Sequence, residues 1–133
     1  MDPFSGTWIA NLSKSQRHPN HLFESATLRF DVSGDVVLVS QAGINMSGKH
    51  ESGKTTLRPD GKEHPVSAEG TGVVVVTKWV GSRILDTVVK KDGEAIGQGT
   101  YEVSDDGSTL TATIWGTDAS GAQFQQVIVS DRE

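Results

Sequence analysis

Seven turns containing glycine divide almost the whole chain into segments of strand length. Each of these glycines follows or adjoins Ser, Asp or another turn-forming residue. Such pairs between alternating segments predict hairpins, because glycine adopts the positive φ that tight hairpin turns require. Consecutive hairpins leave no room for crossover helices, so the sequence predicts an antiparallel sheet. The seven residues are Gly34, Gly48, Gly61, Gly81, Gly93, Gly107 and Gly121.

The segments between these turns read as about ten strands. Alternation is clearest in residues 26–32, where Leu28, Phe30 and Val32 share one face. A meander of eight to ten strands usually removes its exposed edges by closing into a barrel, and such a barrel can hold a small ligand. We therefore predict an all-β fold with little or no helix, in which residues 1–133 form one antiparallel up-and-down barrel domain of eight to ten strands.

Residues 11–24 are the one long stretch without a strand pattern. They are polar, and Pro19 lies in their middle. At about fourteen residues the stretch is near the length at which a loop is usually functional or acts as a lid. We expect at most one short helical turn, around residues 20–24, and expect a ligand to enter the barrel beside this loop.

Length and charge limit the kinds of partner. With 133 residues the chain is long enough for one domain with its own core. Its net charge of -5 disfavours nucleic acid and anionic membranes, since both attract a basic surface. The longest apolar run, residues 73–76, is far shorter than the ~20 residues of a membrane span. We expect a small-molecule partner, no nucleic acid or membrane partner, and a monomer or homodimer.

Two features concern the compartment. The chain has no cysteine, which fits a reducing compartment. Its first residues, MDPF, lack the basic and apolar regions of a signal peptide. As given, the sequence predicts a cytoplasmic protein. A cleaved precursor would also begin at the first strand, so a periplasmic or secreted protein stays an alternative.

Several expected inward faces carry polar residues. The register that turns Val39 inward also turns Gln41 inward. The register that turns Ile96 inward does the same for Gln98 and Glu102. A packed core rejects an unpaired polar group at a cost of ~1–3 kcal/mol, whereas a cavity accepts it, and a shift of one residue turns it to solvent instead. The candidate ligand-binding residues are Phe30, Gln41, Trp79, Gln98, Glu102, Trp115 and Gln125.

Three of these residues have alternative roles. Trp79 and Trp115 lie on strands for which the pattern does not decide which face is inward. Each could form the wall of a ligand site, plug the core or be a partly exposed cross-strand aromatic. A buried Glu102 without a cationic partner would have a raised pKa and could act as an acid or base; on an outer face it could not.

Three classes of function follow from these alternatives. The first is binding of a small, partly polar hydrophobic organic molecule inside the barrel. The second is an enzyme, an isomerase or hydrolase, in which an interior Glu or His acts on an enclosed small molecule; Glu102 is the best catalytic candidate. The third is a barrel with a filled core that binds another protein.

Residues 48–55, GKHESGKT, match the phosphate-binding loop pattern letter for letter. That pattern functions between a buried strand and a helix N-terminus, and the following TTLRP cannot begin a helix. The match is therefore read as chance, and no cofactor is expected. The histidines are scattered and no cysteine is present, so no metal site is expected either. They are His18, His21, His50 and His64.

The segment FSGTW at residues 4–8, together with Arg132, resembles the calycins, the superfamily of lipocalins, fatty-acid-binding proteins and avidins. In that superfamily a Gly-x-Trp tryptophan plugs one end of the barrel, and an arginine from near the C-terminus packs over its ring. The resemblance assigns these roles to Trp8 and Arg132. It implies that residues 1–133 form a single lipocalin-like, ligand-binding barrel of eight to ten strands.

More closely, residues 2–8 and 60–66 look like small bacterial lipocalin-like proteins of unassigned function. The chain departs from fatty-acid-binding proteins in two places. Residues 11–24 look too short and too polar for their helix pair. The last strand carries no Arg-x-Tyr pair to hold a carboxylate, so the resemblance supports the fold and does not identify the ligand.

Overall fold

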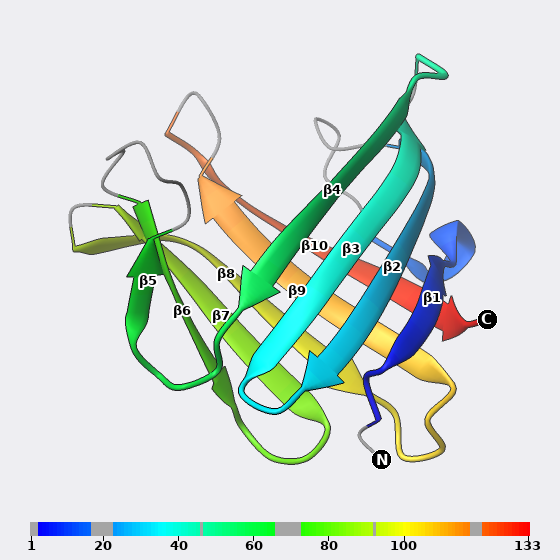
Figure 1. Ribbon diagram of the computed structural model, residues 1–133. Helices are drawn as coiled ribbons and strands as arrows, with labels where there is room; N and C mark the ends of the chain where they lie inside the picture. Colours follow the sequence, from blue (N-terminus) through cyan, green and yellow to red (C-terminus); the bar gives the residue numbers. More distant parts are fainter. Residues whose placement is uncertain (1–2, 17–22, 46, 66–72, 92, 118–120) are drawn as a thin grey trace.

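The computed structural model describes residues 3–16, 23–45, 47–65, 73–91, 93–117 and 121–133. They form ten strands and one short 3-10 helix (Figure 1), which confirms the predicted all-β fold. No helix in this described part has the length and hydropathy needed to cross a membrane. The elements are β1 (Gly6–Ala10), η1 (Leu12–Lys14), β2 (Phe23–Ser33), β3 (Val36–Asn45), β4 (His50–Leu57), β5 (Glu63–Pro65), β6 (Val73–Trp79), β7 (Ile84–Lys91), β8 (Glu94–Val103), β9 (Thr109–Thr117) and β10 (Gln123–Arg132).

All ten strands belong to one antiparallel sheet that curls into a half-barrel (Figure 1). Its order is β4-β3-β2-β1-β10-β9-β8-β7-β6-β5, and the first and last strands of the chain pair with Trp8 opposite Arg132. β4 and β5 follow one another in the chain but are the two edges of the sheet. In the described residues the barrel wall is therefore open between β4 and β5.

The glycines that the sequence marks as turns all have positive φ, from +59° at Gly34 to +126° at Gly81. Six of the seven join strands that pair with each other, as the hairpin pattern predicts. Gly61 is the exception, because its turn connects β4 to β5. The Gly61 N–H donates to the carbonyl oxygen of Thr77 on β6 at 3.0 Å, so this turn folds against β6 and not into a hairpin.

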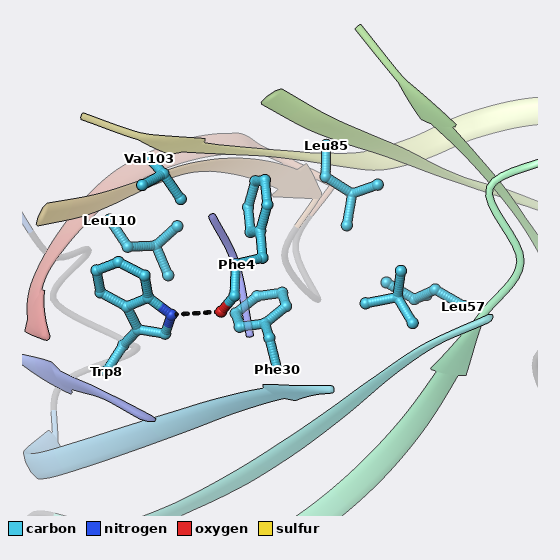
Figure 2. Packing of buried hydrophobic residues seen from close by; sticks show 8 residues of the cluster. Phe4, Trp8, Phe30, Leu57, Leu85, Val103 and Leu110 are labelled. Carbon is cyan, nitrogen blue, oxygen red and sulfur yellow. Dashed lines mark hydrogen bonds between the residues drawn. The ribbon is translucent and has the colours of Figure 1, made fainter. Parts of the chain in front are cut away.

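Buried apolar side chains fill one end of the half-barrel, which we call the packed end (Figure 2). Trp8 is fully buried, and its indole N–H donates to the carbonyl oxygen of Phe4 at 3.0 Å. The guanidinium carbon of Arg132 lies 4.2 Å from the centroid of the Trp8 ring, a position that suits cation–π attraction. The cluster consists of Phe4, Trp8, Phe30, Val37, Leu57, Leu85, Val103 and Leu110.

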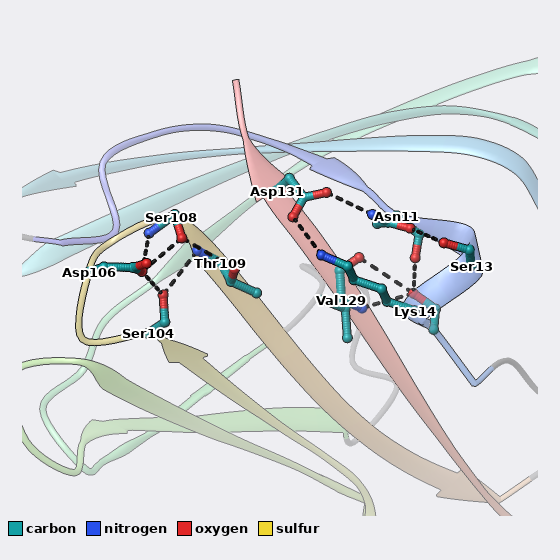
Figure 3. Close-up of polar contacts among 10 residues, drawn as sticks. Asn11, Ser13, Lys14, Ser104, Asp106, Ser108, Thr109, Val129 and Asp131 are labelled. Atoms are coloured by element: carbon teal, nitrogen blue, oxygen red, sulfur yellow. Dashed lines mark hydrogen bonds and ion pairs between the residues drawn. The ribbon is translucent and has the colours of Figure 1, made fainter.

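Polar contacts tie the chain ends to this packed end. Arg132 donates to the carbonyl oxygens of Gly107 at 2.8 Å, Ser5 at 3.0 Å and Pro3. In the β8–β9 turn, Asp106 accepts the hydroxyls of the two flanking serines, at residues 104 and 108, and the N–H of the second (Figure 3). These hydrogen bonds lower the pKa of Asp106 to about 2. The turn is thus held by a carboxylate that stays ionised.

The facing of β8 corrects two of the predicted interior positions. Gly99 and Val103 are buried, so Gln98 and Glu102, at the alternate positions, lie on the outer face. Glu102 is exposed. The prediction was wrong because it took the alternation of β8 from Ile96. This residue lies in a bulge and has no partner on β7: Val89 pairs with Gly97, and Lys90 pairs with Ala95.

Trp115 and Gln125 also lie on the outer face. Ala112 on β9 and Ile128 on β10 are buried, and alternation then turns Trp115 and Gln125 outward, where they are paired across the two strands. The Trp115 indole N–H donates to Gln98 Oε1 at 3.0 Å on the same outer face. The inward face of β10 carries Gln126 and Ser130 in place of the expected Gln125.

The expected loop at residues 11–24 is partly described. Residues 12–14 form η1, and Asn11 and Lys14 contact the Asp131 carboxylate at 2.9 and 3.8 Å (Figure 3). Residues 23 and 24 already belong to β2, so they form no helical turn. Residues 20–22 of the expected turn, and residues 17–22 of the loop beside which the entrance was expected, lie outside the described residues.

Candidate ligand-binding cavity

Next to the packed end, the sheet encloses a cavity of about 680 Å³. This volume lies within the ~300–1,000 Å³ of typical small-molecule sites. Its apolar wall comes from five strands, with Leu28, Val39, Leu57, Val75 and Val89. Its polar members are Gln41, Lys54, Thr55, Thr56, Arg58, His64, Thr87 and Tyr101.

A second cavity, of about 490 Å³, lies toward the start of β2 and the end of β9. Its apolar wall includes Ile114 and Ile128, and Gln126 adds an amide. Both cavities are lined by Leu28, Gln41 and Tyr101, which therefore stand where the two spaces meet. The barrel interior beyond the packed end is thus one hollow region with two compartments.

Two polar groups at this junction are available to a ligand. Gln41 and Tyr101 line both compartments, and neither side chain has a hydrogen-bond partner among the described residues. Burial raises the pKa of the Tyr101 phenol, so this hydroxyl is a neutral donor over a wide pH range. Tyr101 is half-buried and Gln41 is exposed, so a ligand or water can reach both groups.

Aromatic rings connect this junction to the packed end. The ring centroids of Phe30 and Tyr101 are 5.9 Å apart in an edge-on arrangement. The ring centroid of Phe4 lies 5.5 Å from that of Phe30 and 5.4 Å from that of Trp79, and in both pairs the rings are tilted. These separations are typical of favourable aromatic pairs, and Tyr101 is the ring of the series that reaches the cavity.

Of the seven predicted ligand-binding residues, Gln41 alone lines the cavities. Phe30 and Trp79 face the interior but belong to the packed end or pack against it. The other four lie on the outer face, where Gln98 and Trp115 are hydrogen-bonded to each other. Glu102 is exposed and turned away from the cavity, so the interior acid–base role considered for it is wrong. The four are Gln98, Glu102, Trp115 and Gln125.

The sequence analysis missed Tyr101, Gln126 and Thr87. Tyr101 follows a buried glycine by two residues and precedes Val103 by two, so a register counted from Val103 would have turned it inward. Thr87 alternates with the inward residues Leu85 and Val89, a signal that was present in the sequence. Its hydroxyl donates to the Gly99 carbonyl oxygen at 3.1 Å.

The remaining motifs provide no second site. Residues 48–55, the phosphate-loop match, form the turn before β4 and most of β4 itself, with no helix after them. His50 is exposed, and His64 pairs with Asp60 at 2.9 Å. Within the described ranges no three His, Asp or Glu side chains converge as metal ligands. His18 and His21 lie outside those ranges.

No protein-family model and no curated protein matches the chain. Solved structures do match. A mutant of the fluorescent protein UnaG is 22% identical over 97% of this chain and 95% of that chain, with a TM-score of 0.64. A Schistosoma mansoni fatty acid binding protein in complex with arachidonic acid is 17% identical, covers 100% of this chain and 98% of that one, and has a TM-score of 0.67. A zebrafish ileal bile acid-binding protein complexed with cholic acid is 15% identical over 99% of this chain and 100% of that one, with a TM-score of 0.63.

At these identities the likeness shows the fold. The chain therefore has a lipocalin-like, or calycin, fold, as the FSGTW segment and Arg132 led us to expect. Two of the three neighbours are named as binding proteins for small molecules and were solved with a ligand. The resemblance to small bacterial proteins stays a prediction.

Proposed function

We propose that this protein binds a small, partly polar organic molecule inside the half-barrel. The observation that carries the proposal is the hollow junction, where the unpartnered groups of Gln41 and Tyr101 lie among the apolar side chains of the cavity wall. An apolar wall with a few convergent polar groups is the usual composition of a small-molecule site.

The alternatives have less support. A barrel that binds another protein on its surface can have a filled core, whereas this barrel has a cavity of about 680 Å³. The enzyme alternative named an interior Glu or His: Glu102 faces outward, and His64 lines the cavity while paired with Asp60. The structural neighbours bound to arachidonic acid and cholic acid agree with a ligand-binding role for this fold.

The experiment is a binding titration with N-phenyl-1-naphthylamine, an uncharged apolar dye that fluoresces when it leaves water. We expect saturable binding to the wild-type protein. Leu28→Trp, which places a large ring where the two compartments meet, should abolish it. Ile9→Trp is the matched control, because Ile9 is 44% exposed and lies outside the barrel. Equal binding by both variants, or none by the wild type, would refute a site in this cavity.

Native mass spectrometry of freshly purified protein would then identify the natural ligand. A retained mass that Leu28→Trp loses and Ile9→Trp keeps is the expected result.

A further inference from the structure

The 680 Å³ cavity reaches the surface through the gap between β4 and β5. Consecutive residues from Lys54 to Arg58 line it. β4 is one edge of the sheet, so residues of both of its faces can border a space that passes this edge. His64 and Pro65 line it from β5, the other edge. We call residues 54–58, 64 and 65 the β4–β5 opening.

Two basic side chains of the β4–β5 opening have no acidic partner. Lys54 and Arg58 are exposed, and neither forms an ion pair with the described residues. Leu57 is buried, so alternation along β4 turns Lys54 toward the outer face at the sheet edge, where it also lines a hollow with Arg29 and Ser40. The acidic groups closest to them in sequence on this connection are already engaged. Asp60 accepts the Lys62 N–H at 2.8 Å and pairs with His64 at 2.9 Å, and Glu63 pairs with Lys90 at 3.9 Å. The hydrogen bond from Lys62, more than the contact with His64, lowers the pKa of Asp60, which therefore stays ionised beside His64.

Among the described residues, the wall of this cavity contains no carboxylate. No Asp or Glu is among the residues that line the 680 Å³ cavity, although the chain has 17 acidic residues against 12 Lys and Arg. A cleft that carries charges of one sign attracts ligands of the other sign. As an edge strand, β4 also leaves backbone N–H groups unpaired on this side, and these can donate to an oxyanion.

We propose that the ligand of the cavity is an organic anion whose charged group lies at the outer rim of the β4–β5 opening, beside Lys54 and Arg58. Its apolar body extends past Val75 and Val89 toward Leu28, and Gln41 and Tyr101 contact its inner polar atoms. Arg58 offers a planar fork of donors for an oxyanion, and Lys54 adds a mobile point charge. This inference rests on the proposed function and adds the class of ligand and the place of its charged end.

A matched pair of dyes tests the charge requirement. 8-Anilinonaphthalene-1-sulfonate has the skeleton of N-phenyl-1-naphthylamine with one sulfonate added. We expect the anionic dye to bind the wild type more tightly, and Lys54→Gln with Arg58→Gln together to weaken it about tenfold. The uncharged dye should change less than about twofold. Lys49→Gln with Lys78→Gln is the matched control, because it removes the same charge from exposed residues that do not line the cavity.

Salt gives a second readout that does not depend on any variant. The distance over which charges act falls from about 30 Å at 0.01 M salt to about 3 Å at 1 M. Salt should therefore weaken the anionic dye in the wild type and much less in the Lys54/Arg58 double variant. Circular dichroism of each variant checks that the sheet is retained.

The outcomes separate the two proposals. If the uncharged dye binds and the anionic dye binds no more tightly, or if both double variants weaken the anionic dye equally, the anion site is refuted and the cavity function stands. A Lys54/Arg58 variant that weakens both dyes alike also refutes it, because the effect is then on shape. If neither dye binds, the proposed function fails, and the anion site fails with it.

Discussion

The two halves of the barrel interior are formed by the same strands but differ in what occupies them. On β2, Phe30 is fully buried in the packed end, while Leu28, two residues earlier, is half-buried in the cavity wall. On β7, Leu85 is buried in the packed end and Val89 lines the cavity. Strand alternation is equal in both halves, so it determines which side chains face inward and not whether the interior is filled.

The packed end differs from the cavity half by one segment from outside the strands, which adds an aromatic side chain to those that the strands supply. Phe4 precedes β1, and its carbonyl oxygen accepts the Trp8 indole N–H, while its ring contacts Phe30 and Trp79. Among the described residues, no comparable segment enters the cavity half. The comparison therefore predicts that stability depends on the packed end and ligand binding on the cavity half.

The largest expected effect comes from removing the centre of the packed end. Trp8→Ala should lower the free energy of unfolding by roughly 3–5 kcal/mol, because a fully buried indole leaves a large void. Urea unfolding monitored by circular dichroism measures this. The control is Ile9→Ala, whose side chain is 44% exposed on the opposite face, where surface substitutions usually stay within about 0.5 kcal/mol. A loss of less than about 1 kcal/mol in the free energy of unfolding for Trp8→Ala would show that the tryptophan does not plug the barrel.

A pair of leucines sharpens the comparison with identical chemistry. Leu85→Ala should cost about 2–5 kcal/mol, since Leu85 is fully buried among packed neighbours. Leu28→Ala should cost clearly less, about 1 kcal/mol, because one side of Leu28 already faces open space and loses fewer contacts there. Only Leu28→Ala should change dye binding. Equal losses from both would mean that the two halves are packed alike.

Much of the fold was predictable from the sequence because turns and alternation are local. Gly93 and Gly107 predict hairpin turns because glycine adopts a positive φ, and the strands that they join pair as expected. The opening between β4 and β5 was not predictable, since the Gly61 turn has the same sequence signal as a hairpin turn. Which distant edges pair depends on the curl of the whole sheet.

The site was predicted less well than the fold. Gln41 was identified because Val37 and Val39 give β3 a register without interruption. Gln98 and Glu102 were misplaced because one bulged residue, Ile96, reverses the facing of a strand when the count begins there. Lys54 and Arg58 could not be identified, because an exposed lysine or arginine has the same pattern whether or not a cavity opens beside it.

Arg132 should have a smaller effect than the buried residues beside it. Arg132→Gln removes the cation over the Trp8 ring and the donors to the carbonyl oxygens of Ser5 and Gly107. We expect a loss of about 1–2 kcal/mol in urea unfolding, because exposed cation–π pairs and single hydrogen bonds each contribute about 0.5–1.5 kcal/mol. Arg29→Gln is the control, since its exposed ion pair with Asp31 should contribute under about 1 kcal/mol. Similar losses from the two would make the contact with Trp8 incidental.

The smallest effects, with opposite signs, are expected at the border of the two halves. Thr77 and Thr87 face each other across β6 and β7, and both are buried. The Thr87 hydroxyl donates to the Gly99 carbonyl oxygen, so Thr87→Val should destabilise by about 1 kcal/mol. The Thr77 hydroxyl is the one buried side-chain oxygen or nitrogen in the described residues without a hydrogen-bond partner. Thr77→Val keeps the shape and removes a desolvated polar group, so it should stabilise by about 1 kcal/mol. Urea unfolding of the two variants in parallel measures whether each change stabilises or destabilises the protein. A loss of stability in both would show that the Thr77 hydroxyl has a hydrogen-bond partner in solution. The two threonines would then contribute to stability as the packed end does.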